Sequence, residues 1–293
     1  MKDICCIGHI TIDRVITPDH TTHMPGGTSY YFAKGINRLP DISFQLVTAV
    51  GPNETDIISN LRKEGIDVIS LPSRKTVFFE NKYGSNGNQR TQRVLAKADP
   101  FTIEGIQTAD AARIYHLGSL LADDFSPELV RHLSARGGQI SVDVQGFLRH
   151  VEGETVMPVE WKNKMEIMPY INILKVNEYE MEVLTGKNEP HAAARTIGDW
   201  GVNEVCVTLG DYGSVIYADR HFYEIKAYPP ARLTDPTGCG DTYSTGYLYC
   251  RAKDMAPDEA GRFAAAMSTL KLETSGPFSR TAADIRELMN RYD

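Results

Sequence analysis

Short apolar runs rich in β-branched residues alternate with longer amphipathic stretches along most of this chain. The runs predict β-strands, and the stretches between them carry the residue spacing of helices. Such alternation indicates βαβ units, and therefore an α/β fold with a mostly parallel central sheet and helices on both faces. The predicted strands cover residues 4–12, 44–50, 66–71, 114–117, 139–144, 171–176 and 204–209.

Helix signals lie between these strands. The run Ser126-Pro127-Glu128 combines an N-cap residue with proline at the first helical position. Residues 53–64 place Ile57, Ile58 and Leu61 at the spacing of one helical face. Both signals predict helices that cover the sheet.

One region breaks this alternation of strands and helices. Residues 76–83 and 89–96 alternate polar and apolar side chains around the turn sequence at 84–88, which contains Asn-Gly. This pattern is typical of a hairpin with one wet face, which predicts a small sheet that stands off the main body. Because no linker or repeat interrupts the chain, we expect one domain, residues 1–293, with a β lid inserted in it.

The apolar side of this hairpin needs cover. It includes Val77, Phe79 and Val94. Pairing with the lid of a second subunit would supply that cover, so a homodimer through the lid is a further expectation.

Composition narrows the class of partner. Hydrophobic residues make up 42% and charged residues 24% of 293 residues, as in ordinary globular proteins. The net charge of -7 argues against nucleic acid or an anionic membrane as the main partner. Because no apolar run reaches the roughly 20 residues of a membrane span and no signal peptide is evident, we expect a cytoplasmic protein.

The five cysteines show no C-x-x-C spacing. Cys5 and Cys6 lie in an apolar run, where neighbouring residues of a strand point to opposite faces. We therefore expect buried free thiols rather than a zinc site or disulfides.

The segment from Thr234 to Thr242 carries the most chemistry. Gly238 and Gly240 allow a tight turn and close approach to a ligand, and a helical pattern follows them. The start of a helix presents unpaired N–H groups that bind phosphate. Asp241 at this point predicts a base that removes a proton from an attacking hydroxyl. A glycine-rich loop with an aspartate N-cap is the alternative.

This segment resembles the C-terminal signature of the PfkB/ribokinase family of carbohydrate kinases, Asp-x-x-Gly-x-Gly-Asp. Other motifs of the family are similar and occur in the same order. They are Gly8 to Asp13, Pro25-Gly26-Gly27-Thr28, Asn177-x-x-Glu180, Thr208-Leu209-Gly210 with Gly213, and Asp235, Gly238, Gly240 and Asp241 of the signature.

The resemblance implies a ribokinase-like three-layer sandwich with a sheet of about nine strands, and a lid built from segments near 10–25 and 75–98. It also implies site residues. Asp241 would be the catalytic base, and the amides of Gly238, Cys239 and Gly240 would stabilise the transferred phosphoryl group. The expected substrate-binding residues are Asp13, Gly26 and Gly27.

The resemblance further implies ATP as co-substrate with Mg²⁺. Asn177 and Glu180 would organise Mg²⁺ through water. Residues on the nucleotide side would be Thr208, Gly210 and Gly213. Carbonyl oxygens near Asp235 and Thr237 would bind a monovalent cation such as K⁺, as in many relatives.

Some of these motifs have simpler readings. Asn-x-x-Glu is also a capping box that starts a helix. Asp13 could be a solvated carboxylate at a strand end, and Gly26-Gly27 an ordinary turn. Arg149 could reach an anionic group of a ligand or form a surface ion pair.

The sequence is compatible with more than one class of acceptor substrate. A small sugar or polyol is the leading acceptor. Because Tyr30 and Tyr31 follow the double glycine and could stack on a base, a nucleoside kinase is the nearest alternative. A sugar-binding sensor without catalysis and a dinucleotide-binding reductase are weaker, since Asp241 is present and the Gly-x-Gly-x-x-Gly fingerprint is absent.

Overall fold

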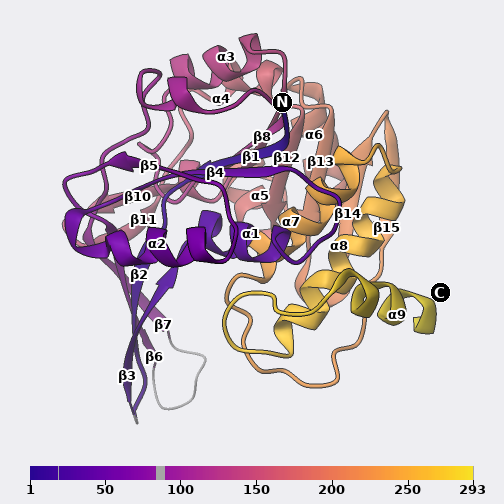
Figure 1. The fold of residues 1–293 in the computed structure, drawn as a ribbon. Helices are drawn as coiled ribbons and strands as arrows, with labels where there is room; N and C mark the ends of the chain where they lie inside the picture. The colour runs from indigo at the N-terminus through magenta and orange to yellow at the C-terminus, as the bar shows by residue number, and fades with distance from the viewer. Residues whose placement is uncertain (19, 84–89, 293) are drawn as a thin grey trace.

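The computed structural model describes residues 1–18, 20–83 and 90–292 (Figure 1). Within them a nine-stranded sheet forms the body of the molecule. All neighbouring strands pair in parallel except at one edge, where β13, β14 and β15 pair antiparallel. Its order is β15 (His221–Ile225), β14 (Ser214–Ala218), β13 (Glu204–Thr208), β12 (Ile173–Asn177), β9 (Gln139–Asp143), β8 (Ala112–Gly118), β1 (Lys2–Gly8), β4 (Phe44–Val50) and β5 (Val68–Pro72).

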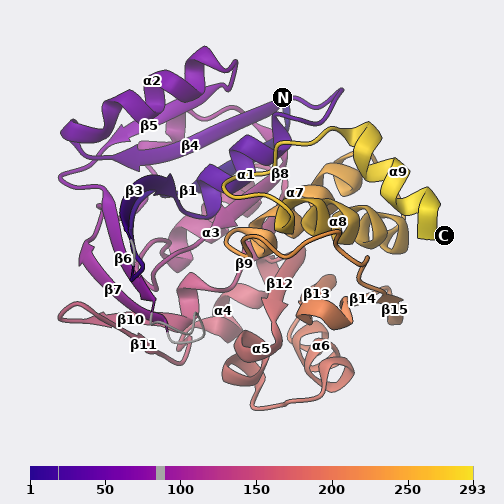
Figure 2. The same cartoon turned by 90° about the horizontal axis from the view of Figure 1, so that it is seen from below.

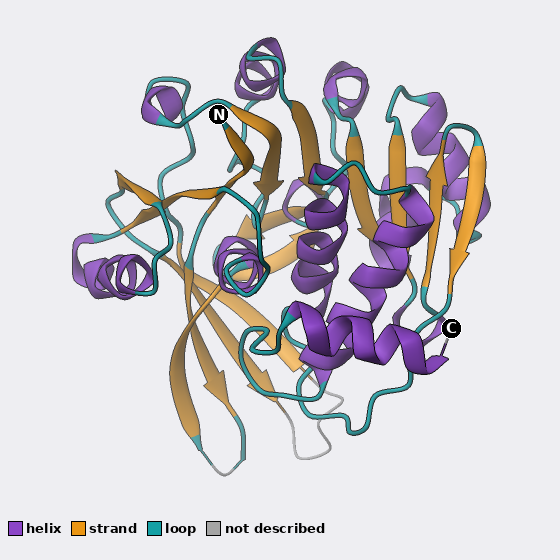
Figure 3. Cartoon of the chain, turned by 45° about the vertical axis from the view of Figure 1, so that its right-hand side comes forward, coloured by secondary structure: helices purple, strands orange, loops and turns teal. Residues whose placement is uncertain are grey.

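Helices cover both faces of this sheet (Figures 2 and 3). One buried cluster joins the sheet to α1 (Thr28–Ile36), α2 (Thr55–Lys63), α7 (Cys239–Ala252), α8 (Pro257–Leu272) and α9 (Ala282–Tyr292). A second cluster joins the other face to α3 (Pro127–Ala135), α4 (Lys164–Ile167), α5 (Glu178–Thr185) and α6 (Pro190–Asp199). The predicted α/β class with helices on both faces is confirmed. Short 3₁₀ turns occupy Pro52–Glu54, Gly105–Thr108, Gly146–Leu148, Met168–Tyr170 and Gly210–Tyr212.

Strand β1 shows how the sequence divides between the two faces. Ile4 and Cys6 belong to the first cluster, whereas Cys5 and Ile7 belong to the second. This is the alternation expected of a strand covered on both sides. The described structure has Cys5 and Cys6 as buried free thiols, as predicted.

A second sheet of six strands lies apart from the nine-stranded sheet. Part of this sheet extends below the main body in Figure 1. Its order is β10 (Arg149–Glu152), β11 (Thr155–Pro158), β7 (Arg90–Ala96), β6 (Val77–Tyr83), β2 (Thr11–Ile16) and β3 (Thr21–Gly26). The prediction of a single strand over 4–12 is wrong, because the chain leaves the first sheet at Gly8 and enters the second at Thr11.

The apolar side of β6 and β7 is covered within the chain. Val77, Phe79 and Val94 are buried together with Leu120 and Leu121, which follow β8. The argument that these residues need a partner subunit therefore no longer holds. The turn predicted at 84–88 lies outside the described residues.

The topology brings the carboxyl ends of several parallel strands to the same side of the sheet, here called its carboxyl edge. Strands β1, β9 and β12 run parallel, so their last residues, Gly8, Asp143 and Asn177, lie at this carboxyl edge. In the described part of the chain, no helix combines the length and the apolar character that a membrane crossing requires.

Candidate active site

Helix α7 begins at a glycine that no other residue could replace without strain. Gly238 is its N-cap and has a left-handed φ of 77°. A Cβ atom built there would lie 2.2 Å from the ring of Tyr31. No side chain caps the helix, so a side-chain acceptor does not occupy its first-turn N–H groups, which are the groups that bind anions at helix starts.

One of the expected amides is already used. The N–H of Cys239 donates to the carbonyl oxygen of Pro236 at 3.2 Å. The amides of Gly240 and Asp241 follow in the first turn, where a helix offers no carbonyl acceptor. The geometry therefore favours Gly240 and Asp241 over Cys239 as donors to a phosphoryl oxygen.

Asp241 lies in the first turn of α7, surrounded by protein but with part of its surface open. Burial raises the pKa of its carboxyl to about 6, and the charge of Asp143 adds to this effect. Lys175, the Thr28 hydroxyl and Arg149 act in the opposite direction. At neutral pH the carboxyl is mostly ionised, and its raised pKa makes it a stronger base than an exposed aspartate.

Lys175 connects the carboxylates of this site. Its Nζ lies 3.0 Å from Oδ2 of Asp143, and both side chains are buried. Burial alone would lower the pKa of Lys175, but the charges of Asp143, Glu180 and Asp241 raise it. A Cβ atom on Gly240 would lie 3.0 Å from this ammonium, so Lys175 reaches the start of α7.

Lys175 was not among the predicted site residues. The signal was a lysine inside the apolar run 171–176, a position that a buried strand fills with a charge only when the charge is paired.

Asn177 and Glu180 form a capping box at the start of α5. The Asn177 side chain accepts from the amides of Tyr179 and Glu180, and the Glu180 carboxylate accepts from the amide of Asn177 at 2.9 Å. Burial raises the pKa of Glu180, whereas Lys175 lowers it. Within the described residues no group of three acidic, histidine or cysteine side chains could hold a metal directly. Both side chains are thus engaged in starting α5.

The double glycine places Asp13 beside the start of α1. Oδ1 of Asp13 accepts a hydrogen bond from the Thr11 hydroxyl at 2.7 Å. A Cβ atom on Gly26 would lie 2.4 Å from Oδ2 of the same carboxylate. Gly27 has a φ of 89° and caps α1, and Thr28 follows it beside Asp241.

The residues expected on the nucleotide side follow β13. Thr208 pairs with Asn177 in the register of β12 and β13, and its hydroxyl donates to the carbonyl of Val176 at 3.3 Å. Gly210 and Gly213 both have positive φ, at 58° and 96°. The structure thus places this turn next to the capping box.

The loop that precedes α7 contains the expected potassium ligands. Oδ1 of Asp235 accepts from the amide of Thr237 at 2.9 Å. The carbonyl oxygen of Asp235, however, accepts a hydrogen bond from Nζ of Lys271 at 2.7 Å. An ammonium group therefore already bonds one carbonyl oxygen of the segment that was expected to bind K⁺.

The two tyrosines after the double glycine differ in how far they are open to a ligand base. Tyr31 is 2% exposed and packs against Gly238. Tyr30 is partly buried and packs against the core beneath α1. Tyr31 is therefore closed to a stacking base in this arrangement, whereas Tyr30 keeps part of its surface exposed.

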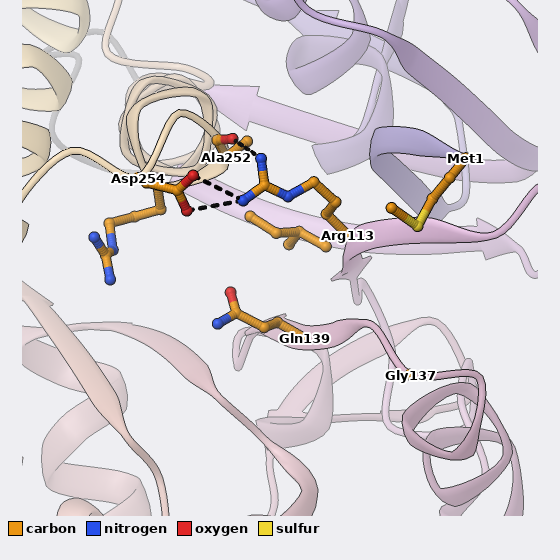
Figure 4. A pocket seen from close by; sticks show the side chains of 8 residues that line it. Met1, Arg113, Gly137, Gln139, Ala252 and Asp254 are labelled. Carbon is orange, nitrogen blue, oxygen red and sulfur yellow. Dashed lines mark hydrogen bonds and ion pairs between the residues drawn. The ribbon is translucent and has the colours of Figure 1, made fainter.

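A pocket of about 260 Å³ lies at the amino ends of the parallel strands, opposite the carboxyl edge (Figure 4). It is lined by residues at the starts of β8 and β9 and the end of α7. Arg113 there bonds the carboxylate of Asp254 at 2.8 Å and the carbonyl of Ala252 at 2.7 Å. This pocket is separate from the residues around Asp241.

The profile of the pfkB family carbohydrate kinases matches residues 1–282 of this sequence. The chain belongs to the pfkB family of carbohydrate kinases. It is therefore a phosphotransferase that acts on an alcohol group, and the resemblance seen in its motifs is confirmed.

Similar proteins act on different acceptors. The cytidine kinase of Thermococcus kodakarensis is 28% identical over an alignment 272 positions long, which covers 87% of this chain and 91% of that protein. A sulfate complex of a pyrophosphate-dependent kinase in the ribokinase family is 27% identical, with a TM-score of 0.87, 97% of this chain and 99% of that chain covered. A pyrophosphate-dependent myo-inositol-1 kinase, converted by mutation into a myo-inositol-3 kinase, has 26% identity, a TM-score of 0.87 and 99% coverage of both chains.

The ion pair between Lys175 and Asp143 generates a prediction for stability. Lys175→Met leaves buried carboxylates without their cation, so we expect the free energy of unfolding to fall by about 3–5 kcal/mol. Urea denaturation at neutral pH measures this loss. The exposed lysine Lys162 provides the matched control, and Lys162→Met should change stability by no more than about 0.5 kcal/mol.

The double variant Asp143→Asn/Lys175→Met separates pairing from packing. Because it removes both members of the pair, it should cost less than the sum of the two single changes. Additive losses would show that the ion pair is not what stabilises this part of the site.

Proposed function

We propose that this kinase transfers the γ-phosphoryl group of ATP to a hydroxyl of a sugar or polyol, with Asp241 as the general base. The observation that carries the proposal is the position of Asp241, an aspartate with a pKa of about 6 in the first turn of α7. A carboxylate serves as a structural cap without such a shift. A base benefits from it, because proton transfer is most effective when the pKa approaches the working pH.

The acceptor hydroxyl would bind between the second sheet and the start of α7. Asp13, fixed by Thr11 and Gly26, would accept hydrogen bonds from hydroxyls that do not react. The reacting hydroxyl would give its proton to Asp241 while its oxygen attacks phosphorus. The amides of Gly240 and Asp241 would then stabilise the charge on the transferred phosphoryl oxygens.

The donor would lie over the first turn of α7 and extend toward Thr208, Gly210 and Gly213. Mg²⁺ would neutralise donor phosphates while held through water near Asn177 and Glu180. We do not assign K⁺ to Asp235 and Thr237, since the Lys271 ammonium already bonds the carbonyl of Asp235. Two similar structures are of pyrophosphate-dependent kinases, so pyrophosphate should be tested as a phosphoryl donor beside ATP.

Two considerations favour a polyol-type acceptor over a nucleoside. Tyr31, which could have stacked on a base, is buried against Gly238. Two similar structures, each with a TM-score of 0.87, are of pyrophosphate-dependent kinases, one of them acting on myo-inositol. The similarity to a cytidine kinase keeps nucleosides in the experiment.

A panel of acceptors tests the proposal. Pentoses, hexoses, inositols and nucleosides would each be incubated with Mg·ATP or Mg·pyrophosphate, and phosphorylated products identified by mass spectrometry. We expect turnover of a sugar or polyol with ATP. Turnover of nucleosides alone would assign the chain to the other branch of the family, and turnover with pyrophosphate alone would overturn the assignment of ATP.

Replacing the base should abolish most of the turnover while preserving the fold. Asp241→Asn keeps the shape of the side chain but cannot accept the proton, so kcat should fall by about 10²–10⁴-fold. Donor affinity should stay the same or improve, because a negative charge beside the phosphates is removed. Steady-state kinetics and calorimetric donor binding measure the two effects.

Asp199 offers a matched control, since it is exposed at the end of α6. Asp199→Asn should leave kcat unchanged. If folded Asp241→Asn retained kcat within about threefold of the parent, Asp241 would be a helix-terminus residue without a role as base.

Asp13 should act in binding rather than in proton transfer. Asp13→Ala removes a carboxylate that hydroxyls would pair with, so the acceptor KM should rise by about 10–100-fold, equivalent to one or two hydrogen bonds to a charged group. ATP affinity should change little. Loss of ATP binding with intact acceptor binding would show that Asp13 belongs to the donor site, which would contradict this assignment.

A further inference from the structure

Lys271 is a lysine whose side chain is entirely inaccessible to solvent. It lies in the last turn of α8 and is 0% exposed. Its Nζ is 2.7 Å from the carbonyl oxygen of Asp235, 3.4 Å from Oδ2 of Asp235 and 3.5 Å from the carbonyl oxygen of Thr274. Most lysines extend their ammonium to water, so a fully covered one requires oxygens that replace its hydration.

These oxygens belong to the loop that leads into α7. The carboxylate of Asp235 accepts from the amides of Thr237 and Gly276 as well as facing Lys271. The loop ends at Gly238, which is the N-cap of α7. The ammonium therefore ties the end of α8 to the segment that sets where the first-turn amides of α7 point.

Tyr31 closes the same arrangement from another side. The Lys271 Nζ lies 6.0 Å from the centroid of the Tyr31 ring, and that ring packs against Gly238. Ser268, one turn earlier on α8, donates from its hydroxyl to the carbonyl of Cys239 at 3.0 Å. Contacts from α1 and α8 thus hold the loop. Among the described residues, Lys271 is the only cationic side chain with a bond to the carbonyl oxygen of Asp235.

The ligands of this ammonium have the chemistry of a monovalent-cation site. Backbone carbonyl oxygens and one carboxylate replace the hydration shell of an ion such as K⁺. We propose that the Lys271 ammonium is a built-in monovalent cation, a positioning residue that holds the Asp235–Gly238 loop for phosphoryl transfer and makes an external cation unnecessary. This inference rests on the proposed function of the α7 amides.

The parent protein provides the first test. Turnover of an accepted substrate from the panel should be equal, within about twofold, in potassium chloride and in tetramethylammonium chloride of the same ionic strength. A severalfold stimulation of the parent by K⁺ would overturn the inference, because the site would then still need an external ion.

Removing the ammonium should create a cation requirement. In tetramethylammonium chloride, Lys271→Ala should lose about 10²-fold in kcat, the scale expected when catalytic groups shift by about 1 Å. The space left by the side chain can admit K⁺ or NH₄⁺, so either ion should restore most of kcat, with a smaller change in acceptor KM. A merely structural lysine would give a loss that these ions do not restore.

Thermal unfolding provides a readout that does not depend on activity. K⁺ should raise the Tm of Lys271→Ala but not of the parent, since an ion that binds only the folded state stabilises it. Thermal unfolding tests the role of Lys271 even if no substrate of the panel is turned over. A lack of turnover would count against the proposed function alone. The exposed lysine Lys253 at the end of α7 is the control, and Lys253→Ala should acquire no cation dependence.

A second variant covers a failure to fold. Lys271→Met retains most of the buried stem and removes only the charge, so it should fold and lose kcat. If Lys271→Met kept parental kcat in tetramethylammonium chloride, the ammonium would have no positioning role and the proposal would be wrong.

Discussion

A buried group of charges at the carboxyl edge of the sheet is the constraint on which the rest of the site depends. Asp143, Lys175, Glu180 and Asp241 come from four different segments and interact electrostatically, with the first three buried and Asp241 partly buried. Like charges so close would repel strongly without Lys175, which lies within reach of all of them. The strand order that places β9 beside β12 is what brings this cation and its first carboxylate together.

The same edge shows why two helix starts are needed. The glycine at the start of α7 leaves the amides open to an anion, and the double glycine at the start of α1 places Asp13 and Thr28 near the base. Tyr31 on α1 packs against Gly238, so the two starts are mechanically connected. One side of the site would therefore hold the acceptor and the other the phosphates, with Asp241 between them.

Sequence patterns predicted the parts of the fold that local rules control. The strand over 44–50 and the Ser126 cap of α3 were found where expected, because burial on both faces and capping leave local signatures. The passage from one sheet to the other at residues 9 and 10 was missed, since an apolar run carries no mark of which sheet it joins. Strands β10 and β11 were missed because they are short and mostly exposed.

The site divides in a similar way. Asp241 and the glycines form a compact motif, so the sequence could indicate them directly. Lys175 and Lys271 were not predicted as site residues, and Tyr31 was expected to stack on a base rather than to pack against Gly238. Their roles depend on which oxygen or glycine the fold brings beside them. A lysine within an otherwise buried stretch is the one local signal that two of them share.

The pH dependence of kcat/KM tests most directly whether Asp241 is the base. A base with a pKa of about 6 must be ionised to act, so kcat/KM should be level at neutral pH and fall tenfold per pH unit below about 6. The residual activity of Asp241→Asn should lack this acidic limb, which distinguishes the enzyme's carboxyl from titration of the donor phosphates. An acidic limb that persists unchanged in Asp241→Asn, or one that appears only near the ordinary aspartate pKa of about 4, would contradict the account.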